Sequence, residues 1–154
     1  MNLPEVGTSA PEFESLDDGG EPIKLSDYRG KEVILYFYPR ADTPGCTKEA
    51  CAFRDDYSAY EEADVVILGV SPDTVKKQAN FKKKWDLPFP LIADEDHSIA
   101  AAYGVWGPKK FMGREYEGVH RTTFIIDKKG KIKQVFENVK PAEHSEEILA
   151  AIRS

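Results

Sequence analysis

Cys46 and Cys51, the two cysteines of the chain, follow a short run of turn-forming residues. The segment from Pro39 to Cys51 reads PRADTPGCTKEAC, in which Asp42 or Thr43 can cap a helix and Pro44 suits its first turn. We therefore expect Cys46 in the first turn of a helix. Unpaired backbone N–H groups and the helix dipole favour an anion there, so they stabilise the thiolate, which is the nucleophilic form of cysteine.

The residues just before Cys46 are expected to build the rest of a nucleophilic site. Thr43 lies three residues earlier, where its hydroxyl can reach both the sulfur and a substrate, although Thr43 can also serve only as the helix cap. Pro44 and Gly45 let the backbone turn tightly and shield the thiol from bulk water. The free N–H groups of the first turn can hold an oxygen atom of a bound substrate.

The spacing of the two cysteines creates a geometric conflict. Positions five residues apart on an ideal helix differ by a rise of about 7.5 Å and a rotation of about 140°, so their Cα atoms lie roughly 8–9 Å apart. A disulfide tolerates at most about 7 Å. A bond between Cys46 and Cys51 therefore requires the first turns of the helix, near residues 44–52, to unwind.

Peroxide is the substrate that suits this chemistry. A thiolate that attacks a peroxide becomes a sulfenic acid, which condenses with a second thiol to a disulfide. Negative charge develops on the departing oxygen, and nearby donors would stabilise it. Two other functions stay open on these residues alone. One is a thiol–disulfide oxidoreductase, against which the missing C-x-x-C spacing argues, and the other is a redox sensor that changes partners by unwinding.

Simpler interpretations of the cysteines also exist. Both can be buried core residues, and Cys51 can be a helix residue without a redox role. A zinc site is disfavoured, because zinc needs four ligands and the three histidines, which we take as incidental, lie far from the cysteines. Two cysteines also do not make the disulfide scaffold of a small secreted protein.

Hydrophobic periodicity and turn residues predict alternating strands and helices. A hairpin is expected around residues 18–20 and a polar loop at 104–119. The expected strands span 33–38, 65–70, 91–93, 121–126 and 131–136, and the expected helices span 43–61, 73–85, 98–103 and 141–152.

Two of these elements carry more detailed expectations. Pro88 and Pro90 flank the strand at 91–93, which suggests an edge strand. In the helix at 73–85 we expect Asp73 to be the cap, with Val75, Ala79 and Trp85 facing inward.

The order of the elements predicts a three-layer α/β domain. In such sheets the functional crevice lies at the carboxyl ends of the strands. The helix that carries Cys46 directly follows the apolar run at 33–38, which is typical of a central strand covered on both faces. Cys46 is therefore expected at the active edge of the sheet.

Length and charge restrict the remaining function classes. The chain has 154 residues, which predicts one domain over 1–154. Its net charge of −6 argues against nucleic-acid or anionic-membrane partners, since both need a basic surface. No apolar run approaches the roughly 20 residues of a membrane span, and the N-terminus has no secretion signal, so we expect a cytoplasmic protein.

The chain also resembles the peroxiredoxins. The pattern Pro39-x-x-x-Thr43-x-x-Cys46 looks like the active-site signature of that family, and CTKEACAFRD around the cysteine pair resembles the Q-type, or bacterioferritin-comigratory-protein, subfamily. The similarity covers nearly the whole chain, with further matching segments SPD at 71–73, FPL at 89–91, AD at 93–94, KKFMGREY at 109–116 and HRTTFIID at 120–127.

This resemblance implies a thioredoxin-like three-layer α/β/α sandwich with a central mixed sheet and an N-terminal extension. It also implies a thiol-dependent peroxidase for hydrogen peroxide and organic hydroperoxides. Cys46 matches the peroxidatic cysteine, Cys51 the resolving cysteine and Thr43 the catalytic threonine. Arg121 matches an arginine that reaches the thiolate from a distant strand, and Glu49 stands at a position linked to orienting that arginine.

The resemblance further implies a partner and an assembly state. The reductant is expected to be thioredoxin or a related dithiol protein, and no metal or organic cofactor is implied. Because Cys46 and Cys51 belong to one chain, no second subunit has to supply a thiol, and we expect a monomer.

Overall fold

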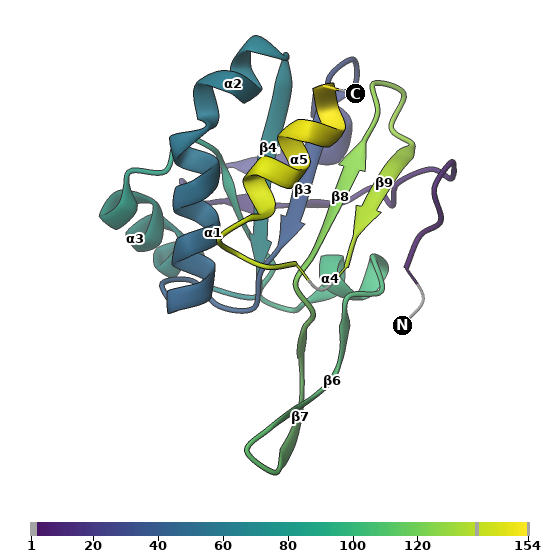
Figure 1. The fold of residues 1–154 in the computed structure, drawn as a ribbon. Coiled ribbons are helices and arrows are strands. Elements are labelled where there is room, and N and C mark those ends of the chain that lie inside the picture. The colour runs from purple at the N-terminus through teal and green to yellow at the C-terminus, as the bar shows by residue number, and fades with distance from the viewer. Residues whose placement is uncertain (1–2, 138, 154) are drawn as a thin grey trace.

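The computed structural model describes residues 3–137 and 139–153 and is built around a seven-stranded sheet with helices on both faces (Figure 1). The strands are β1 (Glu14–Asp17), β2 (Pro22–Lys24), β3 (Glu32–Phe37), β4 (Val65–Ser71), β5 (Leu91–Ala93), β6 (Trp106–Phe111), β7 (Arg114–Val119), β8 (Thr122–Ile126) and β9 (Ile132–Phe136). The helices are α1 (Pro44–Asp55), α2 (Tyr57–Glu62), α3 (Val75–Trp85), α4 (Ser98–Ala102) and α5 (His144–Arg153), with a 3-10 turn η1 (Leu25–Tyr28).

The main sheet is mixed and has β3 near its centre. Its strand order is β2-β1-β5-β4-β3-β8-β9. β3 pairs in parallel with β4 and antiparallel with β8. In the antiparallel register, Phe37 at the end of β3 faces Thr122 at the start of β8. The residue before β8 is therefore brought to the end of β3, where α1 begins.

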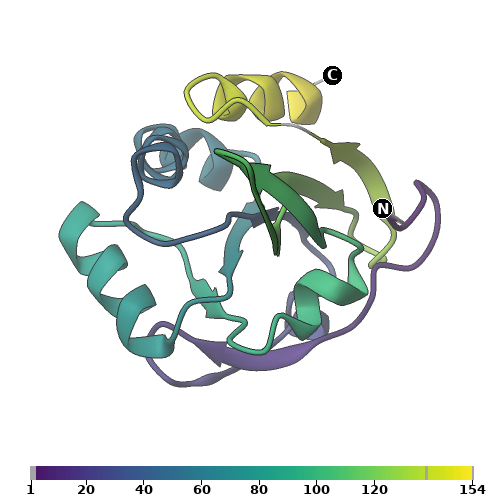
Figure 2. The same cartoon turned by 90° about the horizontal axis from the view of Figure 1, so that it is seen from below.

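The apolar run of β3 is buried on both faces because helices cover both. Val33, Leu35 and Phe37 belong to a core cluster that also contains Ile99 of α4. The alternate residues, including Tyr36, pack in a second cluster with residues of α1, α3 and α5. Figure 2 shows α4 on the opposite side of the central strands from α1 and α5. The predicted α/β/α sandwich with a central mixed sheet is confirmed.

Gly69 of β4 makes room for the ring of Tyr36 beside α1. The two residues are paired across β3 and β4. A Cβ atom at Gly69 would lie 3.0 Å from Tyr36 Cε1 and 3.0 Å from Leu91 Cδ2, which is closer than ordinary packing allows. The glycine thus lets the Tyr36 ring lie against the backbone of β4 and pack on Phe53 of α1, with ring centres 4.9 Å apart.

The prediction of a polar loop at 104–119 is wrong, because this segment forms the hairpin β6–β7. The two strands form a separate sheet that projects from the body of the molecule (Figure 1). Their side chains are mostly exposed, so the sequence shows no alternation of apolar and polar residues. The local signal is the turn: Met112 and Gly113 have φ values of 51° and 82°, as a two-residue hairpin turn requires.

The prediction of an edge strand at 91–93 is also wrong. β5 lies inside the sheet, between β1 and β4. Pro88 and Pro90 do not prevent this, because both precede the three paired residues. The carbonyl of Pro90 still accepts a hydrogen bond from Gly69 N–H at 3.1 Å. The predicted hairpin around residues 18–20 is confirmed by the pairing of β1 with β2.

Several helix predictions need correction. The expected single helix at 43–61 is divided at Asp56, whose carboxylate accepts a hydrogen bond from Ser145 Oγ at 2.7 Å. The last helix begins at His144 rather than 141.

The expected cap of α3 is wrong as well, and its buried face is only partly as expected, since Trp85 does pack against the core. Thr74, not Asp73, caps this helix. Its fully buried residues are Gln78 and Phe81, while the expected inward residues Val75, Ala79 and Trp85 are half-buried. Among the helices formed by the described residues, none is long and apolar enough to cross a membrane.

Candidate active site

Cys46 lies in the first turn of α1, as the sequence predicts, and its residue surface is 1% exposed. Thr43 is the cap residue, and its carbonyl accepts the first helical hydrogen bond from Thr47 N–H at 2.8 Å. Pro44 has no N–H group. The amides of Gly45 and Cys46 are therefore the first-turn donors for which the helix itself offers no acceptor.

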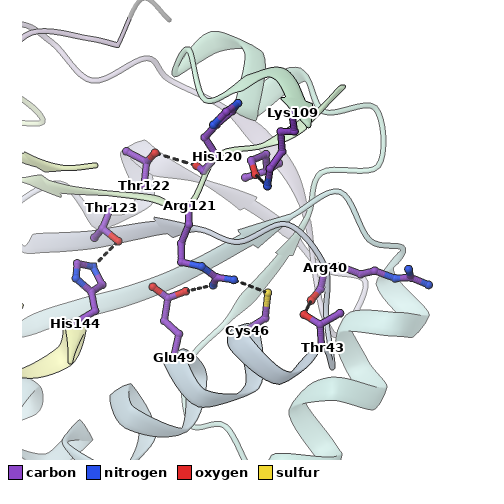
Figure 3. A network of polar contacts seen from close by, with 11 residues as sticks. Arg40, Thr43, Cys46, Glu49, Lys109, His120, Arg121, Thr122, Thr123 and His144 are labelled. Atoms are coloured by element: carbon purple, nitrogen blue, oxygen red, sulfur yellow. Dashed lines mark hydrogen bonds and ion pairs between the residues drawn. The ribbon is translucent and has the colours of Figure 1, made fainter. Parts of the chain in front are cut away.

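Arg121 contacts both the Cys46 sulfur and the Glu49 carboxylate of α1. It stands immediately before β8, 75 residues from Cys46, and its Nη2 donates to Cys46 Sγ at 3.3 Å. Its Nη1 donates to Glu49 Oε1 at 2.7 Å. Figure 3 shows the guanidinium lying between the sulfur and the carboxylate. One planar cation thus contacts two groups one helical turn apart, which a lysine ammonium cannot reproduce.

The Glu49 carboxyl is fully buried, and its Oε2 has no hydrogen-bond partner among the described residues. Burial raises the pKa of Glu49 from 4.5 to about 7, although Arg121 opposes this effect. Burial also acts to lower the pKa of Arg121, but the charges of Glu49 and Cys46 outweigh it and raise that pKa. The guanidinium therefore stays charged while the carboxyl can change its charge near neutral pH.

Replacing Glu49 by glutamine is expected to alter how stability depends on pH. The pKa of Glu49 is higher in the folded state, so its favourable contribution is complete below about pH 4.5 and is lost as the pH rises through about 7. The parent should therefore lose on the order of 3 kcal/mol relative to Glu49→Gln over this range. Urea unfolding of both proteins at several pH values measures the difference, and groups that they share, such as His144, cancel. A constant difference across the range would contradict the expectation.

The other residues of the motif lie after β3 and at the start of α1. The Thr43 hydroxyl donates to the carbonyl of Arg40 at 2.8 Å, so its oxygen can still accept a hydrogen bond from a ligand (Figure 3). A Cβ at Gly45 would lie 3.2 Å from Arg121 Nη2, so this glycine leaves room for the guanidinium. Pro39 is half-buried and lies two residues after the end of β3, and Pro44 is exposed at the start of α1.

A buried polar network, which the sequence did not indicate, holds the loop before α1. Asp73 Oδ2 accepts hydrogen bonds from Ala41 N–H at 2.7 Å and from Ser71 Oγ at 2.6 Å. Gln78 Nε2 donates to Ser71 Oγ at 2.8 Å and to the carbonyl of Ile92 at 2.8 Å. Asp73 thus anchors the loop rather than capping α3. In the sequence, the one hint of this role is that Asp73 stands shortly after the apolar run at 65–70.

Tyr36 and Lys109 also lie within electrostatic reach of Cys46, and the sequence indicated neither of them. Burial raises the pKa of Tyr36 well above its usual value, and the charges of Glu49 and Cys46 add to this effect. Burial and the charge of Arg121 lower the pKa of Lys109, against the attraction of Cys46. Lys109 Nζ donates to the carbonyl of Val119 at 2.8 Å. Lys109 lies in β6, within the segment predicted to be a polar loop.

Cys51 is not brought to Cys46 in this structure. Both thiols are free, and both lie on α1, which is a continuous helix from Pro44 to Asp55. Cys51 is half-buried, and burial raises the pKa of its thiol. The helix therefore separates the two sulfurs as the spacing argument predicts.

The histidines do not gather at the sulfur. His144 is buried and its Nε2 lies 2.7 Å from Thr123 Oγ1, which makes it a packing and hydrogen-bonding residue of α5. His97 stacks on Trp106. Within residues 3–137 and 139–153, no group of three or more His, Cys, Asp or Glu side chains is arranged to hold a metal ion.

Comparison with known proteins identifies the family to which the chain belongs. The model of the AhpC/TSA family matches residues 6–135. The chain is 48% identical over 149 residues to a peroxiredoxin Bcp of Bacillus subtilis, covering 97% of this chain and 95% of the relative. It is 44% identical to a peroxiredoxin Bcp of Escherichia coli, covering 97% and 96% of the two chains.

Solved structures agree with the sequence relatives. The bacterioferritin comigratory protein of Xanthomonas campestris, studied for its alkyl peroxide reduction activity, superposes with a TM-score of 0.90 at 32% identity, covering 97% of this chain and 98% of that chain. A peroxidoxin BcpB of Mycobacterium tuberculosis superposes with a TM-score of 0.86 at 37% identity, covering 97% of each chain. The chain thus belongs to the AhpC/TSA family, among the peroxiredoxins of the Bcp or Q type, and is a thiol-dependent peroxidase.

Proposed function

We propose that Cys46 is the peroxidatic residue and that the enzyme reduces both hydrogen peroxide and organic hydroperoxides. The observation that carries this proposal is the 3.3 Å contact of Arg121 Nη2 with Cys46 Sγ at the start of α1. A cation and a helix N-terminus together favour the thiolate. The alkyl peroxide reduction activity of the Xanthomonas relative supports the organic substrates.

In the first step, the Cys46 thiolate attacks one peroxide oxygen and the O–O bond breaks. The sulfur becomes a sulfenic acid, and the other oxygen takes up a proton and leaves as water or an alcohol. Arg121 and the amides of the first turn stabilise the charge that develops on the leaving oxygen. Thr43 accepts a hydrogen bond from the peroxide and orients it, while Pro44 and Gly45 keep bulk water away.

In the second step, the Cys51 thiol condenses with the sulfenic acid to give a disulfide and water. Because α1 holds the two sulfurs apart, this step requires the helix to unwind over its first turns. Thioredoxin or a related dithiol protein then reduces the disulfide to the two starting thiols. Glu49 acts on Arg121 and not on the peroxide, since its 2.7 Å ion pair orients the guanidinium.

The two reacting thiols also suggest an assembly state and a compartment for the enzyme. Both reacting thiols belong to one chain, so a monomer suffices, and residues 1–154 act as one domain. Thiols that must return to the reduced state suit a reducing compartment, which favours the cytoplasm.

Replacing Cys51 by serine tests this cycle. Cys51→Ser is expected to keep the rate of the first oxidation, because Cys51 does not touch the reacting atoms. It should lose at least about tenfold in thioredoxin-driven turnover, because the sulfenic acid finds no second thiol. The first oxidation is followed under single-turnover conditions, and turnover by peroxide consumption with thioredoxin. Unchanged thioredoxin-driven turnover would remove Cys51 from the cycle.

A further inference from the structure

Trp85, the last residue of α3, contacts both ends of α1. Its indole Nε1–H donates to Asp42 Oδ1 at 2.9 Å, and Asp42 lies two residues before the helix. Its backbone carbonyl accepts a hydrogen bond from Arg54 Nη1 at 2.8 Å, in the last turn of α1. A single residue of another helix therefore bridges the whole length of the helix that carries both cysteines.

The contact with Asp42 is supported by charge and backbone geometry. Lys84 Nζ binds the other carboxylate oxygen of Asp42 at 2.9 Å. The hydrogen bond from Trp85, followed by that from Lys84, lowers the pKa of Asp42, so its carboxylate is ionised at neutral pH. Asp42 has a φ of 60°, in the left-handed region that favours glycine, asparagine and aspartate. The surrounding contacts therefore hold a specific conformation just before α1.

Trp85 itself is held by a helix that is anchored to the sheet. Phe81 and Gln78 of α3 are fully buried, and Gln78 Nε2 donates to the carbonyl of Ile92 in β5. The half-buried Trp85 ring packs against the core cluster that contains Tyr36 and Phe53. The hydrogen bond of Gln78 is made to β5 and not to α1, so α3 keeps this anchor on the sheet when the first turns of α1 open.

We propose that Trp85 is a positioning residue that keeps α1 folded during reaction with peroxide and limits how fast Cys51 reaches the oxidised Cys46. This inference rests on the proposed cycle. The Cys46 sulfenic acid has two fates, since it loses water with the Cys51 thiol to form the disulfide, or reacts with a second peroxide to give a sulfinic acid and water or an alcohol. Trp85 favours the second fate, because it slows the opening on which the first depends.

Replacing Trp85 by phenylalanine removes the N–H donor and keeps a ring for packing. The helix start then loses a hydrogen bond to a charged acceptor, so the opened form is more populated and the disulfide forms about tenfold faster. At a fixed peroxide concentration, the ratio of sulfinic acid to disulfide should fall by a similar factor. A variant that is destabilised elsewhere in the fold, with the start of α1 intact, is not expected to show this acceleration.

The experiment mixes reduced protein with one equivalent of hydrogen peroxide to follow disulfide formation, and with a fixed excess to allow sulfinic acid to form. Each reaction is quenched with acid and a thiol-blocking reagent. Mass spectrometry then gives the amounts of sulfenic acid, disulfide and sulfinic acid over time. Trp106→Phe is the matched control, because Trp106 stacks on His97 and lies in the hairpin sheet, away from α1. Asp42→Asn keeps an oxygen acceptor for the indole and should stay within about threefold of the parent.

The outcomes separate this inference from the cycle on which it rests. If the parent forms no Cys46–Cys51 disulfide, the proposed cycle is overturned and the inference with it. If the parent forms the disulfide and Trp85→Phe forms it at the same rate or more slowly, the role of Trp85 alone is overturned. Should Trp85→Phe fail to fold, Asp42→Gly provides the test, because glycine accepts the left-handed backbone and removes both side-chain contacts. Asp42→Gly should show the same acceleration, together with faster hydrogen exchange over residues 44–52.

Discussion

Cys46→Ser is expected to lower peroxide turnover by at least about a thousandfold. Serine has almost the same shape, so the first turn of α1 and the contact with Arg121 can persist. Its hydroxyl stays protonated at neutral pH, however, even next to a guanidinium and a helix N-terminus. The variant therefore keeps the site but has no nucleophile and no sulfur to oxidise.

Turnover is measured as peroxide consumption with thioredoxin as the reductant, on the parent, Cys46→Ser and Cys51→Ser. Urea unfolding of the three proteins checks that the serine variants are folded. Cys51→Ser is the matched control for the first oxidation, followed under single-turnover conditions, because it also replaces a thiol of α1 but leaves that step intact. Activity of Cys46→Ser above about one per cent of the parent would assign the nucleophile elsewhere.

Arg121→Lys is expected to slow the first oxidation by about a hundredfold. Arg121 donates to Cys46 and Glu49 at the same time, through separate nitrogens of one rigid plane. A lysine ammonium reaches one of these partners, and the buried Glu49 attracts it more strongly than a sulfur at 3.3 Å. The thiolate then loses its donor, and so does the leaving oxygen.

The rate constant of the first oxidation is measured in single-turnover experiments with hydrogen peroxide, without thioredoxin. Removing the charge entirely would leave Glu49 buried without a partner, so the neutral form is tested as the double variant Arg121→Met with Glu49→Gln. Its oxidation should be at least as slow as that of Arg121→Lys. Lys109→Gln removes another cation near Cys46, one that binds the carbonyl of Val119, and should cost far less. Equal losses in Arg121→Lys and Lys109→Gln would mean that Arg121 contributes only a positive charge near Cys46 and not a specific hydrogen bond.

The structure also explains which expectations failed. The hairpin β6–β7 was missed because its strands lie outside the core and show no hydrophobic alternation. β5 was placed at an edge because of two prolines, yet a proline disturbs a sheet only where its missing N–H would have been paired. The second error concerns strand partners, which are decided by contacts between residues far apart in the sequence, since β5 lies between β1 and β4. The first concerns a local hairpin whose strands have no buried face.

Local chemistry of the chain determined the position and separation of the thiols. A buried strand, a proline at the first helical position and a small residue before Cys46 suffice to start α1 there, and a spacing of five residues suffices to keep Cys51 away. These features depend on contacts within one or two turns, so they can be read without the rest of the molecule. The role of Arg121, by contrast, came from the family resemblance and not from any spacing.

Only the tertiary structure decided what surrounds the sulfur. Arg121 arrives because β8 pairs antiparallel with β3, which brings a residue 75 positions away to the start of α1. The burial of Glu49 and the bridge from Trp85 to both ends of α1 depend in the same way on the docking of separate elements. Such contacts form only when hydrophobic burial has assembled the layers, and no local pattern specifies which side chains will then meet.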